Sequence, residues 1–262
     1  MISALRSAFV DIRAGLALKR VWMALATEDI DDQHRRTTLG PIWLLVNYLA
    51  FVGTFLVLFG RGSGSPNISA YIAIGLLVWF YMAEVIGSSI SLFAREEAFI
   101  KGTTLPLSVY VLRQTAQSII RSGYAVVGCL AILLLTGTLP QLSWFPSLLG
   151  LLLLLVTTPA VIIVCAIGGA FFPDLQFIIS NFLRIGLFIT PIFWVYTGEG
   201  GVRELFYYWN PFTYFLEIVR VPILTGTVPL GAFTACLLMG LALWIAALLL
   251  LGRYRREVVF AL

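Results

Sequence analysis

Residues 174–226 read DLQFIISNFLRIGLFITPIFWVYTGEGGVRELFYYWNPFTYFLEIVRVPILTG. They begin with an apolar run at residues 175–195 that is long enough to cross a bilayer and is interrupted only by Arg184. Residues 197–204 are polar, and residues 205–224 are rich in aromatic side chains but too polar for an ordinary span. We therefore expect a membrane helix followed by a pair of re-entrant half-helices, since irregular backbone at membrane depth is tolerated only where protein covers it.

The dipeptide Asn210-Pro211 predicts the start of the second half-helix. Asparagine is a favoured N-cap residue, and proline is favoured at the first helical position. A helix that begins there places Glu217 and Arg220 three residues apart on one face, where the two side chains are expected to pair.

The sequence around this dipeptide resembles a known family. A span, a short loop, the segment WNPFTYFLEIVRVPILTG and a last span follow one another as in the membrane subunit of ABC-type polysaccharide exporters, the permeases for O-antigen, capsule and teichoic acid. The resemblance covers residues 30–256 and rests mainly on Asn210, Pro211, Phe212, Tyr214 and Arg220. The arginines that lead into the segment LGPIW at residues 39–43 strengthen it.

The resemblance implies a transport subunit that is not itself an enzyme. It implies a homodimer of this permease with two copies of a separate ATPase beneath it, so that ATP and Mg²⁺ belong to the partner. Lipid-linked polysaccharide would pass along the interface between the two protomers and cross the bacterial cytoplasmic membrane. No cofactor is expected in this chain.

Composition independently predicts an all-α polytopic membrane protein. Hydrophobic residues make up 60% of the chain and charged residues only 11%, and the mean hydropathy is +0.97. The net charge of +4 comes from basic residues that flank apolar runs, which argues against nucleic-acid binding. A single domain, residues 1–262, is expected to contain the re-entrant pair at residues 205–224 and six spans at residues 39–60, 68–93, 106–136, 147–171, 175–195 and 230–252.

The basic residues also predict the orientation of the chain. Six spans place both termini on one side of the membrane, and thirteen lysines and arginines lie on that side. Arg61, Arg203 and Arg220 lie on the other side. By the positive-inside rule, both termini are cytosolic and the re-entrant pair faces outward.

Residues 3–26 predict an amphipathic helix, because Leu5, Phe9, Ile12 and Leu16 share one face and basic residues occupy another. Such a helix lies in the membrane interface; the alternative is an ordinary surface helix on the cytosolic side of the bundle. Residues 28–34 then contain four acidic side chains and a histidine. They favour a solvated turn or a docking surface for a basic partner over a hard-cation site.

Residues 94–114 form a charged segment that starts helical and breaks at Gly102 and Pro106. The resemblance implies that this segment contains the cytosolic helix that docks on the ATPase. The residues expected to make the contact are Glu96, Glu97, Phe99 and Lys101, with Asp31 and Arg35 contributing.

Two sets of aromatic residues are candidates for the substrate path. Pyranose rings stack their C–H faces on aromatic planes, so weak and repeated contacts would let a sugar polymer slide. The candidates are Tyr48, Phe51 and Phe55 on the first span, and Tyr207, Trp209 and Tyr214 near the outer mouth. The alternative is that these residues pack helices or belong to the aromatic belt at the membrane interface.

Glu84 and Arg184 each lie inside an apolar span. An ionised side chain there costs about 2.5–3.5 kcal/mol, so such residues face the bundle interior or water, and one of each sign invites pairing. Two hypotheses stay open. Either Arg184 meets the diphosphate of a lipid carrier or lines the polymer path, with Glu84 as its resting partner, or the two residues serve only the structure, as an ion pair or with Arg184 bonded to backbone carbonyls.

The sequence lacks the motifs of an enzyme. No Gly-rich phosphate loop accompanies Lys19 or Lys101, and no nucleophile elbow, zinc-ligand spacing or dinucleotide turn occurs. His34 is the only histidine, and the three cysteines lie in apolar segments without metal-site spacing. Two other transport functions stay open: an ABC exporter of a drug or small lipid, and an ion-coupled secondary transporter, which usually shows internal repeats.

Overall fold

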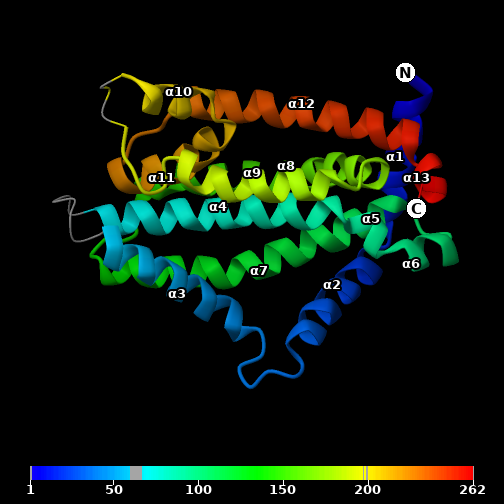
Figure 1. Cartoon of the computed structure of the whole chain (residues 1–262), viewed down its shortest axis with the longest axis horizontal. Coiled ribbons are helices and arrows are strands. Elements are labelled where there is room, and N and C mark those ends of the chain that lie inside the picture. The colour runs from blue at the N-terminus through cyan, green and yellow to red at the C-terminus, as the bar shows by residue number, and fades with distance from the viewer. Residues whose placement is uncertain (1, 60–66, 197, 199, 262) are drawn as a thin grey trace.

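The computed structural model describes residues 2–59, 67–196, 198 and 200–261, and every regular element in these ranges is a helix (Figure 1). The all-α prediction is therefore confirmed for this part of the chain. Arg61 and part of the polar patch at residues 197–204 lie outside the described residues. Both termini lie at one end of the molecule, which we call the termini end; the opposite end is the far end (Figure 1).

The bundle consists of long helices that run between the two ends in alternating directions (Figure 1). They are α3 (Ile42–Phe59), α4 (Ile68–Ile90), α7 (Leu107–Leu135), α8 (Phe145–Phe171), α9 (Leu175–Ile189) and α12 (Leu230–Tyr254). Among the described residues, α4, α7, α8 and α12 are long and apolar enough to cross a membrane. The helices α3 and α9 are apolar but shorter. At a rise of about 1.5 Å per residue, α9 covers about 22 Å of a hydrocarbon core about 30 Å thick.

The central helix is α4, which packs against α3, α7, α8, α9 and α11 (Pro211–Thr225) and buries most of its residues. Glycines let α8 approach its neighbours closely. A Cβ at Gly150 would lie 2.7 Å from the carbonyl oxygen of Ile218 on α11, and a Cβ at Gly169 would collide with the carbonyl of Ile90 at the end of α4. The core of the protein therefore sits where α4, α8 and α11 meet.

The N-terminal arm forms two helices, α1 (Ile2–Ala17) and α2 (Lys19–His34), so the predicted single helix over residues 3–26 is wrong. The chain turns at Leu18 because the two helices pack in different places: α1 lies along α7 and α12, and α2 lies on α7 alone. The buried carboxylate of Asp11 accepts a hydrogen bond from the backbone nitrogen of Ser108 over 3.0 Å. It thereby satisfies a free N–H group in the first turn of α7.

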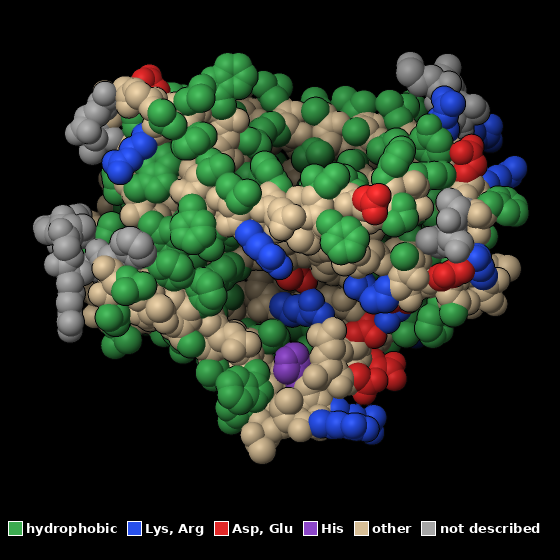
Figure 2. Space-filling view, in the orientation of Figure 1, with side chains coloured by type: hydrophobic (Ala, Val, Ile, Leu, Met, Phe, Trp, Pro, Cys, Tyr) green, Lys and Arg blue, Asp and Glu red, His purple; other side chains and the backbone are tan. Residues whose placement is uncertain are grey.

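The short helices divide between the two ends. The helices α5 (Leu92–Arg95), α6 (Glu97–Gly102) and α13 (Glu257–Ala261) lie at the termini end, and α10 (Val202–Trp209) and the end of α11 lie toward the far end (Figure 1). A single-turn 3-10 helix, η1 (Leu142–Trp144), precedes α8. Charged side chains gather toward the termini end, while hydrophobic side chains dominate the surface nearer the far end (Figure 2).

Candidate functional site

A network of ion pairs, which we call the Arg113 network, fixes the termini end. Arg113 on α7 donates to both carboxylate oxygens of Asp29 on α2, each over 2.6 Å, and to Glu96 between α5 and α6 over 2.8 Å. The amide of Gln117, one turn further along α7, also donates to Asp29. Bidentate guanidinium–carboxylate pairs fix the orientation of both partners. The network therefore holds α2 and α7 together with the bend formed by α5 and α6. We call this bend, residues 92–102, the elbow.

A second series of hydrogen bonds leads from the elbow to the last two turns of α4. Arg95 donates to the amide oxygen of Gln114 over 3.1 Å, and the amide nitrogen of Gln114 donates to the hydroxyl of Ser88 over 2.9 Å. That hydroxyl in turn donates to the backbone carbonyl of Glu84 over 2.6 Å. Polar contacts thus connect the elbow to the part of α4 that carries Glu84.

The elbow presents an exposed face to solvent. Phe99 is 59% exposed, and Glu97 and Lys101 beside it form a surface ion pair at 2.7 Å. An exposed aromatic ring among charged residues suits a protein–protein contact. Glu96 was expected on this face too, but it is only 8% exposed and belongs to the Arg113 network. Its contacts position the elbow from inside.

The acidic residues 28–34 lie on a helix, so the predicted turn is wrong: α2 continues through His34. Asp29 faces α7, whereas Asp31 and Arg35 are exposed. Arg35 reaches Asp32 at 3.5 Å, a surface pair that contributes little stability. The docking roles of Asp31 and Arg35 stay predictions.

A cavity of about 270 Å³ lies between α3, α4 and α7. In its wall Glu84 accepts a hydrogen bond from Arg121 over 2.8 Å, and Arg121 also donates to Gln33 on α2 over 3.0 Å. The predicted pair of Glu84 with Arg184 is therefore wrong. Glu84 lies on the side of α4 that faces α7, whereas α9 packs near Gly87 and exposes Arg184.

The aromatic residues of α3 divide between the interior and the surface. Tyr48 is only 4% exposed and donates to the carbonyl of Ala73 over 2.9 Å, which supports a packing role. Phe51 is 45% exposed and meets Phe80 edge to face, with ring centroids 5.1 Å apart. Phe55 stacks on Phe193 at 4.2 Å. Tyr48 and Phe51 line the cavity, but only Phe51 combines that position with an open ring face.

At the far end, Asn210 begins α11 as predicted. Its side-chain oxygen accepts from the backbone nitrogen of Phe212 over 3.0 Å, and Pro211 occupies the first turn, so the N-cap prediction is confirmed. Its side-chain nitrogen donates to the hydroxyl of Thr190 over 2.8 Å. Gly226, at φ 72°, ends the helix in the left-handed conformation that glycine adopts without strain. Asn210 thus joins the end of α9 to the start of α11.

Arg220 on α11 is buried against neutral groups. Its guanidinium donates to the carbonyl of Pro191 over 2.7 Å and lies 3.7 Å from the centre of the Tyr71 ring. The Tyr71 hydroxyl hydrogen-bonds to the carbonyls of Pro191 and Trp194. Glu217 accepts from Tyr207 of α10 instead of pairing with Arg220. The predicted Glu217–Arg220 ion pair is therefore not formed by direct contact, although the two charges still interact at longer range. Arg220 anchors α11 to the turn after α9.

The remaining far-end candidates form an aromatic cluster. Tyr207 stacks on Tyr196 with ring centroids 4.9 Å apart, and the Tyr214 hydroxyl donates to the carbonyl of Tyr208 over 2.8 Å. Trp209 is 82% exposed. Their position fits both earlier interpretations, a sugar-contacting mouth and an interfacial aromatic belt.

The described residues contain no group of three or more His, Cys, Asp or Glu side chains that could hold a metal ion. The carboxylates of Asp29, Glu84, Glu96 and Glu217 are each bonded to a neighbouring side chain. Polar contacts hold helices at both ends, while aromatic and charged faces stay open for a partner or a substrate.

The sequence analysis did not predict the ion pairs of Arg113. It counted this residue only among the basic residues that predict how the chain is oriented in the membrane. A signal was present: Arg113, Gln117 and Arg121 recur every four residues, which places them on one face of a helix. That polar stripe inside an apolar helix required partners, and α2 and α4 supply them. Tyr71 and Thr190 gave no comparable signal, because single hydroxyls in apolar segments are common.

Two comparisons with known proteins bear on this arrangement. The family model described as ABC-2 type transporter matches residues 20–224, which include the elbow, the Arg113 network and nearly all of α11. The O-antigen export system permease protein RfbA of Myxococcus xanthus is 22% identical over 195 residues. This alignment covers 72% of the present chain and 74% of RfbA.

Proposed function

Because the chain belongs to the ABC-2 type transporter family, we propose that it is the channel-forming permease of an ATP-driven exporter for lipid-linked polysaccharide. Family membership makes it a membrane transport subunit, with the ATPase on a separate chain. The polysaccharide substrate is supported by the similarity to an O-antigen export permease.

The observation that carries this function is the connection between the exposed elbow and the interior of the bundle. Phe99, Glu97 and Lys101 offer a surface to an ATPase, and Glu96 and Arg95 behind them bond to Arg113 and Gln114. Through Ser88 these contacts reach the backbone of Glu84 in the wall of the α3–α4–α7 cavity. A movement that ATP hydrolysis imposes on the elbow would therefore shift α4 at membrane depth.

The proposal includes the orientation of the chain in the bacterial cytoplasmic membrane. We assign α3 and α9 as the first and fifth of six spans, and α10 and α11 as a re-entrant pair on the outer side. The supporting observation is the gathering of basic residues at the termini end, which the positive-inside rule assigns to the cytosol. Exposed Phe9 and Leu16 on α1 suit contact with the cytosolic membrane surface.

The substrate path would lie where two copies of the chain face each other. The helix α9 exposes Ile178, Phe182 and Ile185, which are spaced four and three residues apart and so share one apolar face that a second copy would cover. Phe51 and Phe55 of α3 and the exposed Arg184 of α9 would border the path, with Glu84 reached through the cavity. Tyr207, Trp209 and Tyr214 would form its outer mouth.

The test is deletion of the gene in its native host, followed by complementation with the intact gene. We expect the surface polysaccharide to disappear on gels of cell-envelope extracts, and lipid-linked polymer to accumulate inside the cell. Complementation should restore both. Unchanged surface polysaccharide, with altered resistance to a toxic compound, would instead indicate a drug or small-lipid exporter. Transport by the purified chain in vesicles without any ATPase would indicate an ion-coupled transporter.

A further inference from the structure

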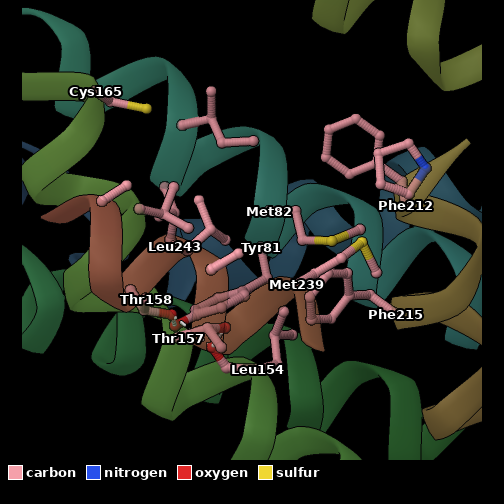
Figure 3. A pocket seen from close by; sticks show the side chains of 16 residues that line it. Tyr81, Met82, Leu154, Thr157, Thr158, Cys165, Phe212, Phe215, Met239 and Leu243 are labelled. Atoms are coloured by element: carbon pink, nitrogen blue, oxygen red, sulfur yellow. Dashed lines mark hydrogen bonds between the residues drawn. The ribbon is translucent and has the colours of Figure 1, made fainter. Parts of the chain in front are cut away.

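A second and larger cavity, of about 560 Å³, lies between α4, α8, α12 and the start of α11 (Figure 3). Cys165 of α8 lies toward one end, and Phe212 and Phe215 of α11 lie toward the other (Figure 3). This cavity is separate from the smaller one between α3, α4 and α7, and none of the contacts described above gives it a role.

The few polar atoms in its wall are already bonded. The hydroxyls of Tyr81 and Thr158 lie 2.6 Å apart, and the hydroxyls of Thr157 and Thr158 each donate to the carbonyl of Leu154 over 2.9 Å. A buried water requires two to four polar partners, and a sugar or a charged ligand requires more. The remaining lining is hydrocarbon, methionine sulfur and aromatic ring. The wall therefore suits only an apolar ligand.

Small residues on α12 create the cavity. Gly240 lets α12 touch α8, because a Cβ there would lie 2.6 Å from a methyl carbon of Thr157. Beyond this contact, Ala242 and Ala246 line the space and are too short to fill it. Ala242 is exposed, so the cavity reaches the surface of the molecule. Its rim continues into the apolar surface formed by Leu238, Leu241 and Ile245.

We propose that this cavity binds one acyl chain of a membrane phospholipid. The chain belongs to a membrane transporter family, and the mouth lies on α12, which is long and apolar enough to cross a bilayer. The ligand that the bilayer supplies along that surface is hydrocarbon, which matches the wall. Phe212 and Phe215 form one end of the cavity, so a bound acyl chain also supports the start of α11. This assignment does not depend on the exported substrate.

The test uses the full chain with its ATPase partner in phospholipid nanodiscs. A trace of phospholipid carries a diazirine group at the end of one acyl chain, and adducts are mapped by mass spectrometry after irradiation. We expect adducts on Met239 and Leu243, whose side chains line the cavity. The substitution Ala246→Phe fills the space and should reduce those adducts by about tenfold, which corresponds to a modest loss of binding free energy.

The matched control is Ile245→Phe, which adds the same ring to the neighbouring, exposed position of α12 and should leave the cavity adducts unchanged. Ala242→Leu is a milder filling variant in case Ala246→Phe does not fold, and it should reduce the adducts as well. Adducts confined to exposed Leu238, Leu241 and Ile245 would overturn the proposal. So would displacement of the label by substoichiometric polyprenyl phosphate but not by excess phospholipid, since the occupant would then be an isoprenoid chain.

Discussion

The two ends of the molecule each use an arginine to hold helices together, a partly buried one at the termini end and a buried one at the far end, but with opposite kinds of partner. At the termini end, Arg113 bonds to two carboxylates from two other segments of the chain. At the far end, Arg220 bonds to the Pro191 carbonyl and lies on the Tyr71 ring. The first arginine bonds directly to two charged groups, whereas the second makes its direct contacts with neutral groups, and Glu217 acts on it only from beyond ion-pair distance.

This difference predicts how each end responds to mutation. Removal of Arg113 would leave the carboxylates of Asp29 and Glu96 without their closest cation, with only Gln117 and the more distant Arg95 beside them. Removal of Arg220 would leave the Pro191 carbonyl still bonded to the Tyr71 hydroxyl. The termini end is therefore the more sensitive of the two, and it is also the end that we assign to the ATPase. The predictions below are ordered by their expected effect on stability.

The largest effect is expected from Arg113→Ala. Loss of one partner from a fully buried ion pair costs about 3–5 kcal/mol. Because the Arg113 network is partly exposed to solvent, the free energy of unfolding of the purified chain in detergent should fall by about the lower of these values. Denaturant titration measures the change. The control Arg253→Ala removes an exposed arginine and should change the free energy by less than about 0.5 kcal/mol.

A triple variant separates lost charge balance from lost packing. Arg113→Met combined with Asp29→Asn and Glu96→Gln keeps the volume and removes all three charges. Replacement of buried ionic groups by neutral ones of similar shape is often tolerated, so we expect most of the stability to return. A triple variant as unstable as Arg113→Ala would contradict the charge argument.

The next effect in size is expected from Arg220→Met. It removes one hydrogen bond from a charged donor and one cation–π contact, and the loss should be about 1.5–3 kcal/mol. The same denaturant titration applies. Tyr71→Phe keeps the ring beneath Arg220 but deletes the hydroxyl, so it should cost less. A larger loss for Arg220→Met than for Arg113→Ala would reverse the comparison between the two ends.

A smaller effect is expected from Asn210→Ala, which deletes the N-cap of α11 together with the hydrogen bond to Thr190. Loss of a side-chain cap costs about 1 kcal/mol. The matched control is Asn67→Ala, because Asn67 precedes α4 in the same position but makes no side-chain cap bond. It should leave the free energy of unfolding nearly unchanged. Equal losses for the two variants would argue against a specific role for the cap at the far end.

The sequence predicted features that depend on neighbouring residues along the chain. The Asn210 cap was predictable because its donor and acceptor lie two residues apart. The long helix from Leu107 was predictable because no proline interrupts the chain between Pro106 and Pro140. Arg113 and Asp29 lie 84 residues apart, and no local pattern relates them.

Charged partners inside the bundle were mispredicted for a related reason. The choice of Arg184 for Glu84 rested on opposite charge and depth, but the rotation of α4 about its axis decides which neighbour Glu84 faces. Likewise, Glu217 and Arg220 lie three residues apart on α11, but each bonds to another segment of the chain. Glu217 accepts from Tyr207 of α10, and Arg220 donates to the carbonyl of Pro191. The break at Leu18 followed from tertiary packing, since α1 packs on both α7 and α12 while α2 packs on α7, and periodicity alone does not record this.

The smallest effect on stability is expected where a ring is exposed at either end. Phe99→Ala and Trp209→Ala both remove an aromatic side chain that solvent or lipid already reaches, so each should change the free energy of unfolding by less than about 0.5 kcal/mol. Their effects on function should differ completely. Exposed aromatic residues at a protein interface often contribute about 2 kcal/mol or more, so Phe99→Ala should weaken binding of the cognate ATPase by more than about tenfold in a pull-down titration. Trp209→Ala should leave that affinity unchanged, because α10 lies toward the end of the molecule opposite the elbow (Figure 1). Equal ATPase affinity for wild type and Phe99→Ala would remove the elbow as the docking site. Weaker binding for Trp209→Ala would mean that the far end, and not the termini end, meets the ATPase.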